Sequence, residues 1–228
     1  MVNIDVIIPA YNEEDSIALV IKEIPKALVR EIIVVDNNSK DKTTENAKDA
    51  GATVLSEYQQ GYGYACLKGI NYLFYKKNLP NIVVFLDGDY SDFPGEMNEV
   101  VEPIIAKNYD MVIGSRALGN REKGSMTPQQ VFGNWLATRM MRIFYGFKYT
   151  DLGPFRAIKF DKLLKLGMQD KTYGWTIEMQ IKAVKHKLTI TEVPVNYKKR
   201  IGFSKVSGTV KGTVMAGIKI IFAIFKYL

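Results

Sequence analysis

Short runs of β-branched and apolar residues alternate along this chain with longer segments of mixed apolar and polar residues. The runs are Ile4 to Ile8, Ile32 to Val35, Ile82 to Leu86 and Met111 to Ile113. Amphipathic helical spacing occurs between them, near Glu13 to Leu28, Thr43 to Ala50, Tyr64 to Lys76 and Gly95 to Lys107. Strands that alternate with helices predict βαβ units, so the fold class is α/β with a Rossmann-like, mostly parallel sheet flanked by helices.

The pattern changes after about residue 115, where a loop with Gly, Ser and Thr begins. It predicts helices at Gln129 to Tyr145 and Trp175 to Lys187, and strands near Phe155 to Phe160 and Thr189 to Tyr197. A final helix is predicted from Ser207 to Leu228. The sequence contains no internal repeat or low-complexity linker, so we expect one domain over residues 1–206, followed by the C-terminal helix over 207–228.

The composition is that of an ordinary globular protein, and it limits the kinds of catalytic site that the chain can form. The chain has 228 residues, 47% of them hydrophobic and 24% charged, which is enough to bury a large core. Cys66 is the only cysteine and His186 the only histidine. This count strongly disfavours disulfides, Cys/His zinc clusters and Ser-His-Asp relays of ordinary form. Any catalysis must use carboxylates, Lys, Arg, Tyr or a metal ion.

The net charge of +7 comes entirely from the C-terminal part of the chain. Residues 198–228 contain no acid and seven cations, namely Lys198, Lys199, Arg200, Lys205, Lys211, Lys219 and Lys226. Such a segment predicts an anionic partner. In the final helix the lysines fall within about an 80° arc and the remaining circumference is mostly apolar. The helix therefore either docks on the protein's own core or lies in a membrane interface while its lysines reach the headgroups.

The first residues have acids where a signal peptide would have a basic and then an apolar run, and no apolar stretch is long enough to span a membrane. We therefore expect a cytoplasmic protein, peripheral at the cytoplasmic face of a membrane.

Three predicted strands end in polar residues, and ligands of open α/β sheets bind at the carboxyl ends of strands. These ends are Pro9 to Glu14, Asp36 to Ser39 and Asp87 to Asp92. Asp87 and Asp89 can present two hard oxygens to Mg²⁺ or Mn²⁺, although a pair of acids that caps a loop has the same pattern. Asp36 can accept bonds from a ribose or base, or can cap the turn that follows it.

Other segments exclude some functions and leave others open. The first turn lacks a glycine fingerprint and no P-loop occurs, which disfavours NAD and P-loop chemistry; Gly61 begins either a simple turn into a helix or a phosphate-binding turn. Arg200 is a candidate bidentate phosphate ligand and Lys205 a candidate point charge, with solvated surface as the alternative. Glu178 lies in a mostly apolar stretch, so it is either a general base with a raised pKa or a structural acid.

Taken in order, these residues resemble the family 2 glycosyltransferases, and within them the dolichyl- or polyprenyl-phosphate sugar synthases. The resemblance spans roughly residues 3 to 205 and rests on Val6 to Glu13, Val34 to Ser39, Asp87 with Asp89, Gly114 to Arg116, Asp151 through Phe155 and Arg156, and Glu192 to Lys205. It implies a GT-A fold. The resemblance also assigns roles to the candidate residues. It implies that the nucleoside is held by Pro9, Ala10, Tyr11, Glu13 and Asp36. It further implies that the metal and diphosphate are held by Asp87 and Asp89, and that the phosphate charge is bound by Arg116, Arg200 and Lys205.

Three positions depart from the family pattern. Asn37 replaces a second acid, Ser91 replaces a metal-contacting Gln, and Pro154 interrupts a loop that more often reads small-Gly-Phe-Arg.

The resemblance predicts a metal-dependent inverting transferase that moves a hexose from a nucleotide sugar, UDP-glucose or GDP-mannose, to a polyprenyl phosphate. A phosphate acceptor is already ionised near neutral pH and needs no strong base. A hydroxyl acceptor on a glycan or small metabolite is the alternative, and Glu178 or Asp151, on the acceptor side, would then be the base. A non-catalytic binder of membranes or nucleic acid is disfavoured because the basic tail has no recognition motif, so we expect no nucleic-acid partner. A homo-oligomer is compatible with the sequence.

Overall fold

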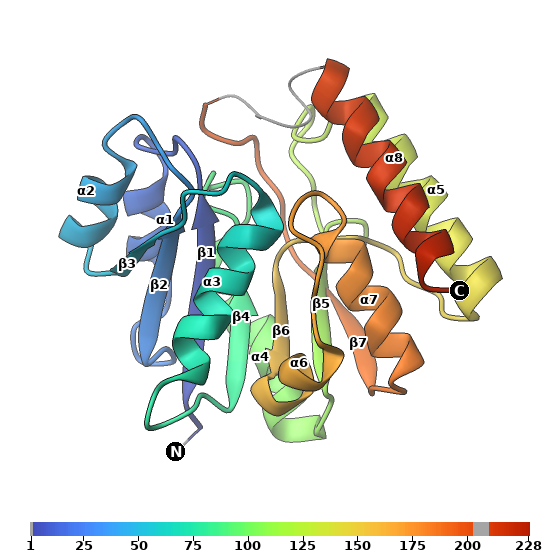
Figure 1. Cartoon of the computed structure of the whole chain (residues 1–228), viewed down its shortest axis with the longest axis horizontal. Coiled ribbons are helices and arrows are strands. Elements are labelled where there is room, and N and C mark those ends of the chain that lie inside the picture. Colours follow the sequence, from blue (N-terminus) through green and yellow to red (C-terminus); the bar gives the residue numbers. More distant parts are fainter. Residues whose placement is uncertain (1, 203–209) are drawn as a thin grey trace.

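The computed structural model describes residues 2–202 and 210–228 (Figure 1). Its described residues form a seven-stranded sheet in the order β3-β2-β1-β4-β6-β5-β7. The strands are β1 (Ile4–Ala10), β2 (Glu31–Asp36), β3 (Thr53–Ser56), β4 (Ile82–Phe85), β5 (Met111–Ser115), β6 (Arg156–Lys159) and β7 (Ile190–Pro194). Only β6 runs antiparallel, to both β4 and β5, and the other pairs are parallel. The α/β class and the mostly parallel sheet are confirmed.

Helices cover both faces of the sheet. The helices are α1 (Ile17–Glu23), α2 (Thr43–Asp49), α3 (Tyr62–Phe74), α4 (Met97–Lys107), α5 (Pro128–Tyr145), α6 (Phe160–Leu166), α7 (Trp175–Lys185) and α8 (Val210–Lys226). One apolar cluster joins α3, α5, α6, α7 and α8 to one face of the sheet, and a second joins α1, α2 and α4 to the other. Because the central strands are covered on both sides, both alternating sets of β1 side chains are apolar and buried, apart from Asp5 and the partly buried Pro9.

Local sequence explains where α5 begins and ends. The Thr127 side chain accepts a hydrogen bond from the Gln130 backbone, and the Gln130 side chain accepts one from the Thr127 backbone, which forms a capping box before Pro128. The helix ends at Gly146, whose φ of 69° is left-handed and favours glycine. This helix follows the predicted Gln129 to Tyr145 segment closely.

Other elements differ from the prediction. Helix α1 begins only at Ile17, because residues 11–16 form a turn at the end of β1. The short edge strand β3 was not predicted, and its four residues pair with β2 alone. Helix α6 was not predicted either. It follows β6 without a loop, and its seven residues are too few to show a helical period in the sequence.

Helix α8 docks on the rest of the protein along one side. It lies beside α5 and α7 (Figure 1), with Ala223 and Ile224 buried in the cluster that includes α7. The Tyr145 hydroxyl donates a hydrogen bond to the Ile224 carbonyl oxygen at 2.5 Å. Among the described helices, none has the length and apolar character that a membrane crossing requires.

Candidate active site

A cavity of about 1190 Å³ lies at the carboxyl ends of β1 and β4 and extends to α5 and α8. At the β1 side it is lined by Pro9, Ala10, Tyr11, Glu13, Asn37 and Gly61. Charged side chains of Asp87, Asp89, Arg116 and Arg200 also line it. The wall formed by α5 and α8 is mostly apolar, with Phe132, Leu136, Ala216, Gly217, Ile220 and Ile221. One cavity therefore brings together most of the residues predicted from separate strand ends.

The two acids of the D-x-D motif follow β4 and face this cavity. Asp87 accepts a hydrogen bond from the Tyr62 hydroxyl at 3.1 Å. Its enclosure and the nearby charge of Asp89 raise the pKa of Asp87 to about 7. Asp89 Oδ1 accepts hydrogen bonds from the Ser91 backbone at 2.9 Å and from the Ser91 hydroxyl at 2.5 Å. Ser91 is thus a support for Asp89, at the position where the family pattern has a Gln.

The donor set at this point fits a divalent cation. The nearby charge of Asp89 raises the proton affinity of Asp87, so a doubly charged ion is favoured at this point, and the oxygens of both carboxylates are the hard ligands that Mg²⁺ and Mn²⁺ prefer. In the described part of the chain, no cluster of three or more His, Cys, Asp or Glu side chains could hold a metal. Asp87 and Asp89 would therefore hold an ion whose other ligands are water and substrate phosphates, as is usual for Mg²⁺.

Arg200 comes from the chain after β7 and reaches the same acids. Its Nη2 forms an ion pair with Asp89 Oδ2 and lies 3.9 Å from Glu13 Oε1. Its Nε is buried and has no hydrogen-bond partner among the described residues. A buried guanidinium N–H without an acceptor beside a predicted diphosphate site is a ready donor to a phosphate oxygen.

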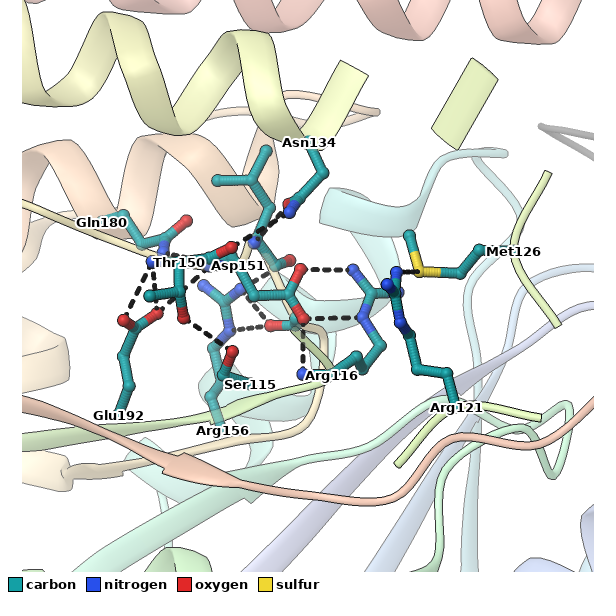
Figure 2. A network of polar contacts seen from close by, with 12 residues as sticks. Ser115, Arg116, Arg121, Met126, Asn134, Thr150, Asp151, Arg156, Gln180 and Glu192 are labelled. Carbon is teal, nitrogen blue, oxygen red and sulfur yellow. Dashed lines mark hydrogen bonds and ion pairs between the residues drawn. The ribbon is translucent and has the colours of Figure 1, made fainter. Parts of the chain in front are cut away.

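Arg116 lines the cavity and is held from behind by Asp151 (Figure 2). The Asp151 carboxylate accepts bonds from the Arg116 backbone N, Nε and Nη2, each at 2.8 Å. Burial alone would lower the pKa of the Arg116 guanidinium, but the paired Asp151 raises it, so Arg116 stays charged. The guanidinium also lies over the Tyr197 ring, 5.0 Å from its centroid. These contacts leave Arg116 little freedom to reorient.

A polar network fixes the loop that carries Asp151 (Figure 2). Glu192 on β7 accepts hydrogen bonds from the Thr150 and Asp151 backbones, and Gln180 donates to the Asp151 carbonyl at 2.9 Å. Arg156 is fully buried and donates to the carbonyl oxygens of Leu152, Gly153 and Thr176. The sequence motif that ends in Arg156 is therefore a scaffold for Asp151 and Arg116.

Two further residues line the cavity that the sequence analysis did not propose as site residues, Asn37 and Tyr62. Asn37 lines the cavity, donates to the Glu57 and Gln59 carbonyls at 3.0 and 2.7 Å, and accepts from the Gly61 backbone at 2.7 Å. An aspartate could not donate those two bonds, which gives a reason for this departure from the family pattern. The second missed residue is Tyr62, whose bond to Asp87 has no signal in the spacing of the sequence.

Asp36 precedes a residue of the cavity wall, Asn37, but is not itself part of that wall. It is buried at the end of β2, and its Oδ1 accepts a hydrogen bond from the Ser39 backbone at 3.3 Å. This is the turn-capping alternative, and Asp36 is not among the residues that line the cavity. Its neighbour Asn37 occupies the wall instead, so the predicted nucleoside contact of Asp36 lacks support from this arrangement.

Gly61 and Gly63 allow the start of α3 to approach a neighbouring loop. A Cβ on Gly61 would lie 2.2 Å from the Lys171 carbonyl oxygen, and one on Gly63 would lie 2.0 Å from that of Asp170. Packing therefore explains both glycines. This agrees with a simple turn into a helix, which was one of the two alternatives for this segment beside a phosphate-binding turn. That loop contributes Thr172 and Tyr173 to the cavity.

The two candidate bases do not face the cavity. Glu178 is fully buried, forms an ion pair with Lys182 at 2.7 Å and accepts hydrogen bonds from the Gln169 and Asp170 backbones and the Tyr227 hydroxyl. Burial alone would raise the pKa of Glu178, but these partners lower it, which favours the structural acid of the two alternatives for this residue. Neither Glu178 nor Asp151 lines the cavity, and Asp151 is committed to Arg116. Lys205 lies outside the described residues.

Comparisons with known proteins agree with this geometry. Residues 5–167 match the glycosyl transferase family 2. The undecaprenyl-phosphate mannosyltransferase of Micrococcus luteus is 27% identical over 93% of this chain and 90% of its own length. A UDP-N-acetylglucosamine–dolichyl-phosphate N-acetylglucosaminyltransferase of Methanococcus voltae is 29% identical over 95% of this chain and 92% of its own length.

The fold also matches a solved structure. Glucosyl-3-phosphoglycerate synthase of Mycobacterium tuberculosis, in complex with Mn²⁺, UDP and glucosyl-3-phosphoglycerate, superposes with a TM-score of 0.77. It shares 22% sequence identity, and the match covers 99% of this chain and 79% of that one. With the family match over residues 5–167 and the sheet described above, this chain belongs to glycosyl transferase family 2 and is a glycosyltransferase with a GT-A fold.

Proposed function

We propose that this enzyme transfers a hexose from a nucleotide diphosphate sugar to a polyprenyl phosphate, in a metal-dependent reaction that inverts the anomeric carbon. The observation that carries the proposal is the continuity of the cavity. Its charged wall contains Asp87, Asp89 and Arg200, and its wall toward α5 and α8 is mostly apolar. A nucleotide sugar suits the first part, and an isoprenoid chain attached to a phosphate suits the second.

Each charged residue has a separate task in this reaction. Asp87 and Asp89 would hold Mg²⁺ or Mn²⁺, which supplies positive charge to the leaving nucleoside diphosphate when bound. Arg200, with its unpaired Nε, donates to the same phosphates. Arg116 is kept charged and fixed by Asp151, which suits it to orient the acceptor phosphate.

Among the described residues, every acid that lines the cavity has another partner or task, which is consistent with a phosphate acceptor. These acids are Glu13, Asp87 and Asp89; Glu13 and Asp89 lie close to Arg200, and Asp87 is assigned to the metal together with Asp89. A phosphomonoester has a second pKa of about 6 and is already a nucleophile near neutral pH. A hydroxyl acceptor would instead need a base within hydrogen-bond reach.

The relatives support the same assignment. The names of the Micrococcus and Methanococcus enzymes specify undecaprenyl phosphate and dolichyl phosphate as acceptors. The Mycobacterium structure holds Mn²⁺ and UDP, which supports a metal and a UDP-sugar as donor. We favour UDP-glucose over GDP-mannose, because Ser91 replaces the Gln of mannosyl enzymes, and UDP-N-acetylglucosamine belongs in the same test.

The test uses the full chain with Mn²⁺, each of these three labelled donors, and a short polyprenyl phosphate. We expect label in the organic phase with one donor, and none when the lipid or the metal is left out. Asp89→Asn should abolish transfer, and Asp161→Asn, on an exposed turn of α6, is the control. Release of nucleoside diphosphate without lipid label would reject the acceptor and point to a hydroxyl. No turnover and no nucleotide binding would reject the donor site as well.

A further inference from the structure

Two helices far apart in sequence expose apolar side chains side by side. Helices α5 and α8 lie next to each other at one edge of the molecule (Figure 1). On α5 the exposed apolar residues include Val131, Trp135 and Ile143, and on α8 they include Val214, Ile218 and Phe222. The two sets are joined where the Phe144 ring contacts the Phe225 ring, with centroids 5.3 Å apart. We call this exposed apolar surface of α5 and α8 the two-helix face.

The two-helix face carries only positive charge. Neither α5 nor α8 contains an acid, whereas α5 has Arg139 and Arg142 and α8 has Lys219 and Lys226. At about 100° per residue, Lys219 and Lys226 fall along one edge of the exposed apolar stripe of α8. Long cationic side chains beside an apolar stripe can reach headgroups while the stripe enters the acyl region.

The inner side of α8 is already occupied, so the outer side is free for a partner. Ala223 and Ile224 are buried, and the Lys185 ammonium donates to the Tyr227 carbonyl at 2.5 Å. The sequence left two alternatives for this helix, docking on the protein or lying in a membrane interface. The structure allows both at once, on opposite sides of α8. The same helix lines the cavity with Ala216, Gly217 and Ile220. The apolar wall of the cavity and the two-helix face thus share α5 and α8.

We propose that the two-helix face docks on the surface of an anionic lipid bilayer, with α5 contributing as much as α8. The inference rests on the proposed function in one respect, since a polyprenyl phosphate resides in a membrane and would enter along α5 and α8. A second copy of the chain is the less suitable occupant. A two-fold interface sets the same surface against itself, so Arg139, Arg142, Lys219 and Lys226 would face like charges with no acid on either helix.

The tryptophans allow a direct test without turnover. The chain has two, of which Trp135 on the two-helix face is 57% exposed and Trp175 is 1% exposed. When the full chain is mixed with phosphatidylglycerol vesicles, we expect the emission of Trp135 to shift to the blue and to be quenched by brominated lipid. Phosphatidylcholine vesicles should bind much less, because they lack the charge that complements the cations. Trp135→Phe should remove the signal.

Matched variants separate the contributions of the two helices. Ile143→Asp on α5 and Phe222→Asp on α8 change side chains that are 66% and 59% exposed and do not line the cavity. Each should weaken vesicle binding, measured by flotation, at least about tenfold. Ile105→Asp, at a position 49% exposed on α4 at the opposite face of the sheet, should leave binding unchanged.

Several outcomes would overturn the proposal. The full chain could fail to float with anionic vesicles, or Ile143→Asp could bind as well as the unmodified chain, which would leave α5 without a role. Dimerisation that both variants abolish, without vesicle binding, would assign the two-helix face to a second copy. Vesicle binding that persists when no lipid is glycosylated would reject the proposed acceptor but retain the docking surface.

Discussion

The hydroxyl of Tyr227, the penultimate residue, donates a 2.7 Å hydrogen bond to Glu178 Oε1 on α7. The same carboxylate accepts the Asp170 backbone N–H at 2.7 Å, and the Asp170 and Lys171 carbonyls approach Gly63 and Gly61 at the start of α3. A chain of direct contacts thus connects the end of α8 with a loop that lines the cavity. Deleting α8 would break it, so point changes are the better probes of this helix.

Tyr227→Phe should lower the free energy of unfolding by about 1–2 kcal/mol, because a hydrogen bond to a buried carboxylate is lost. Urea denaturation measures the change. Tyr58→Phe is the control, since Tyr58 is among the most exposed side chains. Equal stability of the two variants would mean that the Tyr227 hydroxyl contributes nothing.

Glu178→Gln should destabilise the protein by about 2–3 kcal/mol while leaving kcat of the folded enzyme within a few fold. The change removes the partner of Lys182 and the charged acceptor of two backbone N–H groups. Steady-state kinetics at a temperature where the variant is folded tests this. A loss of kcat of about 10²-fold with normal donor binding would instead make Glu178 a base and favour a hydroxyl acceptor.

Tyr62→Phe should weaken Mn²⁺ binding about tenfold or more, since residues that orient a metal ligand usually have effects of that size. The change removes the hydrogen bond of the hydroxyl to Asp87, and the ring remains. Calorimetric titration of Mn²⁺ in the presence of the nucleoside diphosphate measures the affinity. Tyr64→Phe is the matched control on the same helix, and an unchanged affinity for Tyr62→Phe would remove Asp87 from the metal site.

Asp151→Asn should cost at least about 3 kcal/mol of stability, because it leaves the Arg116 guanidinium in a buried site without its charged partner. Asp161→Asn breaks an exposed pair with Lys165 and should change stability by less than about 0.5 kcal/mol. Transfer by folded Asp151→Asn should show a raised KM for the acceptor. A stable, fully active variant would contradict the positioning of Arg116 by Asp151.

We predict that Asp92 makes the stability of the folded protein depend on pH. Its carboxyl is buried, both oxygens lack hydrogen-bond partners among the described residues, and burial together with Asp87 and Asp89 raises its pKa well above the ordinary 3.8. The folded chain therefore holds this proton more tightly than the unfolded chain, so stability falls as the pH rises above about 4. Asp92→Asn should raise Tm at about pH 8 and have little effect at about pH 4. A variant that is less stable at both values would refute this assignment.

The sequence by itself determined the α/β class with a mostly parallel sheet, the order of the polar strand ends and the resemblance to the family. Apolar runs and helical spacing are local properties, and parallel strands bring their carboxyl ends to one edge, so Pro9 to Glu13, Asp87 and Asp89 could be placed together in advance. The edge strand β3 and helix α6 were not predicted, because four and seven residues are too few to show a strand or helix period.

The tertiary structure decided what individual polar side chains do. Glu178 and Asp151 were both candidate bases, but the Tyr227 hydroxyl that donates to Glu178 and the Arg116 guanidinium that pairs with Asp151 lie 49 and 35 residues away, and no local pattern predicts these two contacts. The same holds for Tyr62 on Asp87, 25 residues apart, and for the bonds of Asn37 to the segment before Gly61. The amphipathic pattern of α8 was evident from the sequence. Which side packs on the protein depends on α5 and α7, and only the assembled chain brings them together.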